Sequence, residues 1–307
     1  MFEVLFPLTG TPADDGATAH ALNVARLLGA KVHLVRVLES RRISDRPTDP
    51  VDWMMKKSEA EASLARAAEG LGDGGIETVQ VLLEGDPTEH LVNYARQHRT
   101  DLVLLGRGPQ RGALGDSRGE LLWRSYLTTL LLRPAEPETV QSTDRYQRVL
   151  VALDGSKRAE CVLPWVQMLA EAGEVEILLA HVVTEPVLPR LTPATDEDRE
   201  LAARLVERNR QEATTYLASA RARLGVPAQT RLLQGRKVAS LLHDLVEAEG
   251  IDVVVLSAHG YGGESRWPFG DVATSFIDYG RTPLLLVQDM PKYEPAPVAV
   301  TAESWGG

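Results

Sequence analysis

The chain has 307 residues, of which 44% are hydrophobic and 25% are charged, as in an ordinary globular protein. Its formal net charge of −10 disfavours a nucleic acid or an anionic membrane as partner, because both bind proteins through basic patches. No apolar run approaches the roughly 18 residues of a membrane span, and the first residues lack the features of a signal peptide. Cys161 is the single cysteine, which excludes an intrachain disulfide and a cysteine-based metal cluster. We therefore expect a cytoplasmic protein.

Taken in chain order, the first half alternates apolar strands with helices. It opens with the strand MFEVLFPL and continues through a helix to a second strand at 32–37. A long polar helix follows, and then strands at 81–85, 101–108 and 128–133 with helices between them. This alternation predicts right-handed crossovers and a doubly wound parallel sheet.

The second half repeats the same order of elements. Five segments of the first half match five of the second in the same order, and the offset grows by a few residues, as loop insertions would produce. Such an ordered series indicates a duplication. The matched pairs are 4–11 with 149–156, 32–37 with 177–182, 81–85 with 231–235, 101–108 with 252–260, and 128–133 with 282–287.

The strands of the second half, such as 149–153 and 251–257, are apolar on both faces, which is typical of a parallel sheet covered by helices on both sides. The sequence therefore predicts an α/β protein of two tandem doubly wound domains, each Rossmann-like and five-stranded, that form an internal pseudo-dimer. The predicted domains are 1–134 and 146–290, and we expect 291–307 to be a flexible tail.

The candidate site follows from the fold, because ligands of an open parallel sheet bind beyond the carboxyl ends of the strands, where the strand order reverses. Three segments of the second half end strands there: 154–156, 181–183 and 256–260. Glycine lets a ligand approach the backbone closely, and a helix that starts near Gly270 would direct its N–H groups at an anion. Asp154 can accept hydrogen bonds from a ribose or a base. The pattern therefore favours a ligand that contains phosphate.

At these positions the chain resembles the universal stress protein family, whose nucleotide-binding members carry an Asp after the first strand and the pattern G-x-x-G-x9-G-[S/T]. Here Asp154 follows the strand, and the pattern reads Ser257-Ala258-His259-Gly260, nine residues, and Gly270-Asp271. The resemblance covers residues 1–290 and implies that ATP or AMP binds in the second half only. The nucleotide-binding residues that it implies are Asp154, Val182, Leu256, Ser257, His259, Gly260, Gly270, Asp271 and Val272.

Two of these positions depart from the family pattern. Ser257 replaces the first glycine, and Asp271 replaces the Ser or Thr that would contact a phosphate. A carboxylate about 4 Å from a phosphate charge costs on the order of 4 kcal/mol at an effective dielectric of about 20, which is roughly a thousandfold in affinity. Mg²⁺ between the two charges, or Arg266, would offset the repulsion. In the alternative, Asp271 caps the helix itself and no nucleotide binds.

The first half retains less of the pattern. Thr9 stands where the second half has Asp154. Pro109 lies near the second glycine of the pattern and lacks the backbone donor that a phosphate needs. Gly115 and Asp116 are a shifted remnant of the last pair. We therefore expect this half to be structural.

The family resemblance implies a stress-response binding and signalling protein with an adenine nucleotide, and with protein partners or self-association. Two alternatives remain: a nucleotide-free dimerising protein that acts through protein partners, and a slow ATP hydrolase on the same fold. Ser257, His259 and Asp154 do not fit a hydrolytic triad, because no G-x-S-x-G elbow surrounds the Ser. The last strands, 128–133 and 283–287, pair either with each other or with another chain.

Overall fold

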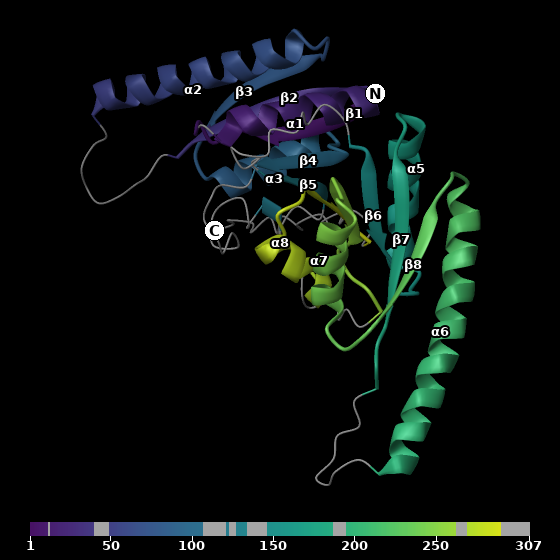
Figure 1. The fold of residues 1–307 in the computed structure, drawn as a ribbon. Coiled ribbons are helices and arrows are strands. Elements are labelled where there is room, and N and C mark those ends of the chain that lie inside the picture. The colour runs from purple at the N-terminus through teal and green to yellow at the C-terminus, as the bar shows by residue number, and fades with distance from the viewer. Residues whose placement is uncertain are drawn as a thin grey trace, which may run out of the picture.

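The described residues form one ten-stranded sheet with helices on both of its faces (Figure 1). The predicted tail, 291–307, and the segment 134–145 between the two halves lie outside the part of the chain that the structure describes. The computed structural model describes residues 1–11, 13–39, 49–106, 121–122, 127–133, 146–186, 195–261 and 269–289.

The first half follows the predicted alternation of strands and helices. Apolar strands buried on both faces alternate with helices whose apolar positions recur at helical spacing. Its strands are β1 (Phe2–Pro7), β2 (Ala30–Leu38), β3 (Thr78–Glu84), β4 (Leu102–Gly106) and β5 (Thr128–Leu132), and its helices are α1 (Ala13–Leu28), α2 (Pro50–Gly72) and α3 (Pro87–Gln97).

The second half repeats this plan with a longer second helix. The capping box of Thr195 with Asp198 starts that helix, and Gly225 ends it in the left-handed conformation, at φ 73°. The strands are β6 (Arg148–Ala152), β7 (Glu176–Val183), β8 (Gln229–Gln234), β9 (Val253–Ser257) and β10 (Leu284–Val287), and the helices are η2 (Ala159–Val162), α5 (Leu163–Glu171), α6 (Asp196–Leu224), α7 (Val238–Ala248) and α8 (Asp271–Tyr279).

The strand order is β3-β2-β1-β4-β5-β10-β9-β6-β7-β8. All neighbours within each half pair in parallel, whereas β5 and β10 pair antiparallel, with Leu131 opposite Leu284 and Thr129 opposite Leu286. The prediction of two tandem doubly wound, five-stranded domains in an internal pseudo-dimer is therefore confirmed. Of the two pairings open to the last strands, the structure has the one within the chain.

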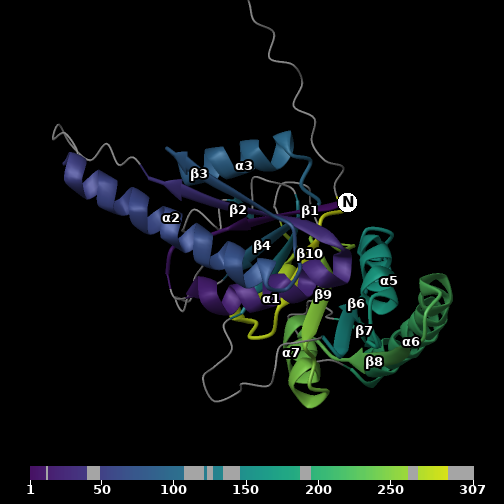
Figure 2. The ribbon, with the colours of Figure 1, turned by 90° about the horizontal axis from the view of Figure 1, so that it is seen from above.

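Successive side chains of each strand enter opposite layers of the core. Val4 and Phe6 belong to the core layer that includes residues of α1, α2, α5 and α6, whereas Leu5 belongs to the layer that includes residues of α3, α7 and α8. In the first half, α1 and α2 lie on one side of the strands and α3 lies on the other (Figure 2). The first layer runs through both halves without a break, since Phe2 meets Trp165 edge to face at a centroid distance of 5.5 Å. Within the described ranges, no helix combines the length and apolar character that a membrane span needs.

Arg133 links the two halves at the end of β5. Its side chain is only 6% exposed, and one guanidinium nitrogen donates to the carbonyls of Phe276 and Ile277, at 2.8 and 3.1 Å. These carbonyls lie in the last turn of α8, where the helix dipole also favours a cation. A charged side chain of the first half thus caps the carboxyl end of a helix of the second half.

We expect Arg133→Met to lower the free energy of unfolding by about 2–3 kcal/mol, because hydrogen bonds from a charged donor are lost and buried carbonyls are left without it. Urea denaturation of the full chain measures the change. Arg210→Met, on the exposed surface of α6, is the matched control and should change stability by less than about 0.5 kcal/mol. An equal effect of the two substitutions would contradict this role for Arg133.

His20 of α1 gives the fold a pH dependence. Its ring is 6% exposed and stacks on Tyr146 at a centroid distance of 6.3 Å, and burial lowers its pKa from the usual 6.5. In the unfolded chain His20 binds a proton near pH 6.5, whereas in the folded chain it stays neutral to a lower pH. The contribution of His20 to stability is therefore complete above pH 6.5 and is lost as the pH drops below that value.

When the pH is lowered from 7.5 to 5.5, we expect the free energy of unfolding to fall less in the His20→Leu variant than in the native chain. Urea midpoints and slopes measured at both pH values give the comparison. His243, whose pKa burial also lowers, is present in both proteins, and its contribution cancels. Parallel pH profiles for the two chains would show that His20 does not contribute.

Candidate functional site

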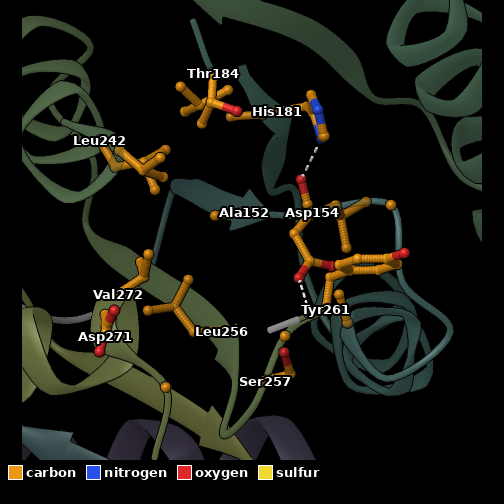
Figure 3. Close-up of a pocket in the computed structure, with 18 of the residues that line it drawn as sticks. Ala152, Asp154, His181, Thr184, Leu242, Leu256, Ser257, Tyr261, Asp271 and Val272 are labelled. Atoms are coloured by element: carbon orange, nitrogen blue, oxygen red, sulfur yellow. Dashed lines mark hydrogen bonds between the residues drawn. The ribbon is translucent and has the colours of Figure 1, made fainter. Parts of the chain in front are cut away.

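A cavity of about 1090 Å³ lies in the second half, at the carboxyl ends of β6, β7 and β9 (Figure 3). β6 has β7 on one side and β9 on the other, so this is the place where the strand order reverses. α6 forms one wall, and α7 and the start of α8 form the other.

Eight of the nine predicted site residues line this cavity, which brings the ends of three strands and the start of α8 together. The ninth, His259, is not among the lining residues. The eight are Asp154, Val182, Leu256, Ser257, Gly260, Gly270, Asp271 and Val272.

Asp154 ties two of these loops together. One carboxylate oxygen accepts the Ser156 N–H at 2.9 Å, and the other accepts the Tyr261 N–H from the loop after β9 (Figure 3). Gly260 is required beside it, because a Cβ at this position would lie 2.2 Å from Asp154 Oδ2. Asp154 therefore positions the loops and presents its remaining lone pairs at the cavity.

The side chain of His259 is buried instead of facing the cavity. It is 3% exposed, and its Nδ1 lies 2.7 Å from Oδ1 of Asp289, which follows the last residue of β10, Val287, by two positions. Ser257 donates its hydroxyl to the carbonyl of His259 at 2.6 Å. The two side chains therefore do not bond to one another in the manner of a hydrolytic dyad.

His181 of β7 and Tyr216 of α6 both line the cavity, and their rings meet edge to face at a centroid distance of 6.2 Å. The Nδ1 of His181 lies 2.8 Å from the Leu153 carbonyl, which can only accept, so Nδ1 carries the proton and Nε2 is left for a ligand. Burial, helped by the charges of Glu160 and Asp154, raises the pKa of Tyr216 to about 12, so its hydroxyl stays protonated.

α6 contributes a wall that the sequence prediction missed. Asn209, Glu212, Ala213 and Tyr216 all line the cavity, and their spacing of three or four residues places them on one face of the helix. This periodicity was the available signal. It marks an inward face, although it does not separate a ligand cavity from an ordinary core.

Asp271 is the first residue of α8, whereas a capping role would place it one position before the helix. Gly270 is the N-cap, at φ −75° and ψ 166°, and Asp271 is the first helical residue with an exposed side chain. The suggestion that Asp271 caps the helix is therefore wrong, because a residue already in the helix cannot take that position. No described group accepts from the backbone N–H groups of 271–273.

The cavity has an apolar floor and an acidic lining. The described lining residues include three carboxylates, those of Asp154, Glu212 and Asp271, and neither lysine nor arginine. The described residues also hold no cluster of His, Cys, Asp and Glu suited to a metal ion. Arg266, predicted as a counter-charge, lies outside the described residues. The apolar floor comprises Ala152, Ala180, Val182, Val238, Leu242, Leu256 and Val272.

At the corresponding position of the first half, a described side chain fills the space over the loop after the first strand. Arg36 replaces His181 at the same point of the second strand, and Nη1 of its guanidinium donates to the Ser63 hydroxyl at 2.5 Å. The guanidinium lies over Gly10, where a Cβ would come within 2.1 Å of it.

The loop after β1 is closed as well. Asp14 accepts the backbone N–H groups of Thr9 and Gly10, at 2.9 and 2.6 Å. Pro109 and the remnant Gly115–Asp116 lie outside the described residues.

Comparison with known proteins identifies the family. The model of the universal stress protein family matches residues 1–121 and 145–288, one match in each half. Universal stress protein MJ0531 of Methanocaldococcus jannaschii is 22% identical over 144 residues, which are 44% of this chain and 84% of that protein.

Solved structures share the whole tandem fold. A universal stress protein from Archaeoglobus fulgidus superposes with a TM-score of 0.66 at 16% identity, covering 94% of this chain and 98% of its own. A Pseudomonas aeruginosa protein, PA1789, reaches 0.64 at 13% identity, with 93% and 92% covered. With a family match in each half and the fold shared along the length of these structures, the chain belongs to the universal stress protein family as a tandem-domain member.

Proposed function

We propose that the protein is a cytoplasmic stress-response binding and signalling protein whose second domain binds an adenine nucleotide, whereas the first domain binds none. The observation that carries the proposal is the contrast between two equivalent positions. The second domain has a cavity of about 1090 Å³ where the strand order reverses, and the first domain has Arg36 packed on Gly10 at its counterpart.

The cavity has the groups that an adenosine moiety needs. Leu256, Leu242 and Val182 offer an apolar surface for a flat ring. Asp154 and Nε2 of His181 are acceptors for ribose hydroxyls or an exocyclic amine, since both present lone pairs there. The N–H groups of the first turn of α8 suit a phosphate.

The proposal treats the protein as a binding module and not as a metabolic enzyme. Asp154 already accepts two backbone N–H groups, which hold its carboxylate between two loops and favour a positioning role. Nε2 of His181 keeps its lone pair, so it is the group that would accept a proton from a water if the protein were a hydrolase. A slow ATP hydrolase is the alternative, and steady ATP turnover that survives rigorous purification would favour it.

A nucleotide-free protein that acts through protein partners is a second candidate. The observation in its favour is the acidic lining, because Asp271 sits on the first residue of the helix that would receive the phosphates. Under this alternative the purified protein carries no nucleotide and binds none.

The direct test is to denature purified protein, analyse the supernatant for released nucleotide, and titrate the native chain with AMP and ATP with and without Mg²⁺. We expect binding of one nucleotide per chain. No released nucleotide and no heat in any titration would refute the proposal.

A matched pair of substitutions locates the site. Val182 lines the cavity, and Val37 is its counterpart in the first domain. We expect Val182→Trp to weaken binding at least tenfold by filling the cavity, and Val37→Trp to leave the affinity within about twofold. Urea denaturation of both variants checks that each is folded. Loss of binding in the Val37 variant alone would place the site in the first domain.

A further inference from the structure

We propose that the second-domain site selects its adenine nucleotide by phosphate charge, with AMP bound more tightly than ATP unless Mg²⁺ is present, and that Asp271 sets this preference. The inference rests on the proposed nucleotide site and goes further, because it names which nucleotides the site accepts and which residue discriminates between them.

The two ends of the cavity differ in the groups that they offer to a nucleotide. The cavity has two ends in Figure 3, one formed by Asp154, His181 and Tyr261 and the other by Asp271 and Val272. The first end offers mainly acceptors, which suit the hydroxyls and amine of a nucleoside. The second end is the start of α8, where the backbone N–H groups of 271–273 have no acceptor among the described residues. Phosphates therefore lie at the α8 end.

The α8 end of the cavity carries an uncompensated negative charge. Asp271 is the first residue of α8, its side chain is exposed, and no described group pairs with its carboxylate. The carboxylate of Asp154 differs, since two backbone N–H groups already hold it. Glu212 on the opposite wall also differs, because Arg208 lies 3.0 Å from it and balances its charge. Asp271 is thus the carboxylate that a phosphate meets without compensation.

The described walls of the cavity offer the phosphates no positively charged side chain. The described lining contains no lysine or arginine. The two cations that follow the lining residue Gly155 most closely, Lys157 and Arg158, are both paired with carboxylates. Lys157 contacts Glu160 at 2.9 Å, and Arg158 contacts the buried Asp289 at 3.4 Å. Each further phosphate group adds negative charge near Asp271 without gaining a cation from the described lining. Affinity therefore falls from AMP to ATP, and Mg²⁺ shared between the carboxylate and the phosphates removes the difference.

The experiment is isothermal titration of the full chain with adenosine, AMP and ATP, first in EDTA and then with Mg²⁺. In EDTA we expect ATP to bind at least tenfold more weakly than AMP. Raising the salt from about 50 to 500 mM should strengthen ATP binding, because screening reduces a repulsion. Mg²⁺ should bring ATP within about threefold of AMP.

Asp271→Asn and Asp271→Ser test the assigned residue. Both remove the charge and should tighten ATP binding in EDTA at least tenfold, with AMP changed less and adenosine within about twofold. Asp52→Asn is the matched control, since Asp52 is a carboxylate in the first turn of α2 in the first domain. It should change none of the three affinities.

The outcomes separate this inference from the proposed function. If none of the three ligands binds under any condition, the nucleotide site itself fails. If ATP binds in EDTA as tightly as AMP, or if the Asp271 variants keep the native preference, nucleotide binding stands and selection by phosphate charge is refuted.

Discussion

The antiparallel pairing of β5 with β10 determines the shape of this molecule. A five-stranded parallel sheet leaves its last strand as an edge of unpaired N–H and C=O groups, and such an edge pairs readily with another chain. Here each half satisfies the edge of the other, through pairs such as Leu131 with Leu284. The shared sheet lets one core layer run through both halves, and it places Arg133 where its guanidinium reaches the end of α8.

Duplication of a binding fold supplies two positions for a site, and a few substitutions decide what each can hold. At the end of the second strand, His181 leaves room for a cavity, whereas Arg36 reaches across to Ser63 and covers Gly10. At the end of the first strand, Thr9 is held by Asp14 in a closed loop. The order of strands is the same in both halves, so at these described positions the two halves differ in the size and reach of their side chains.

Sequence patterns predicted the fold well, because short strands apolar on both faces and ordered internal matches are strong signals of a duplicated parallel sheet. They also brought eight of the nine predicted site residues together at one cavity, since the carboxyl ends of parallel strands meet at one edge. Side-chain direction was harder to predict. His259 lies within the motif, yet its ring points to Asp289, a partner 30 residues away that no local pattern indicates.

Contacts between distant segments escaped prediction for the same reason. Arg133 bonds to residues more than 140 positions away, and Arg36 of β2 donates to Ser63 of α2. Tyr216 belongs to a helical stripe that a buried core would also produce. Periodicity indicates which face turns inward, and only the packed structure reveals what that face meets.

The contact of His259 with Asp289 connects two parts of the molecule that are otherwise described separately. Asp289 ends the segment that begins as β10, the strand that joins the two domains, and His259 belongs to the loop whose Gly260 and Tyr261 enclose Asp154. The geometry of the cavity and the junction between the domains therefore share one buried contact. Thermodynamic linkage then requires that any ligand whose binding strengthens this contact also strengthens the junction by the same free energy.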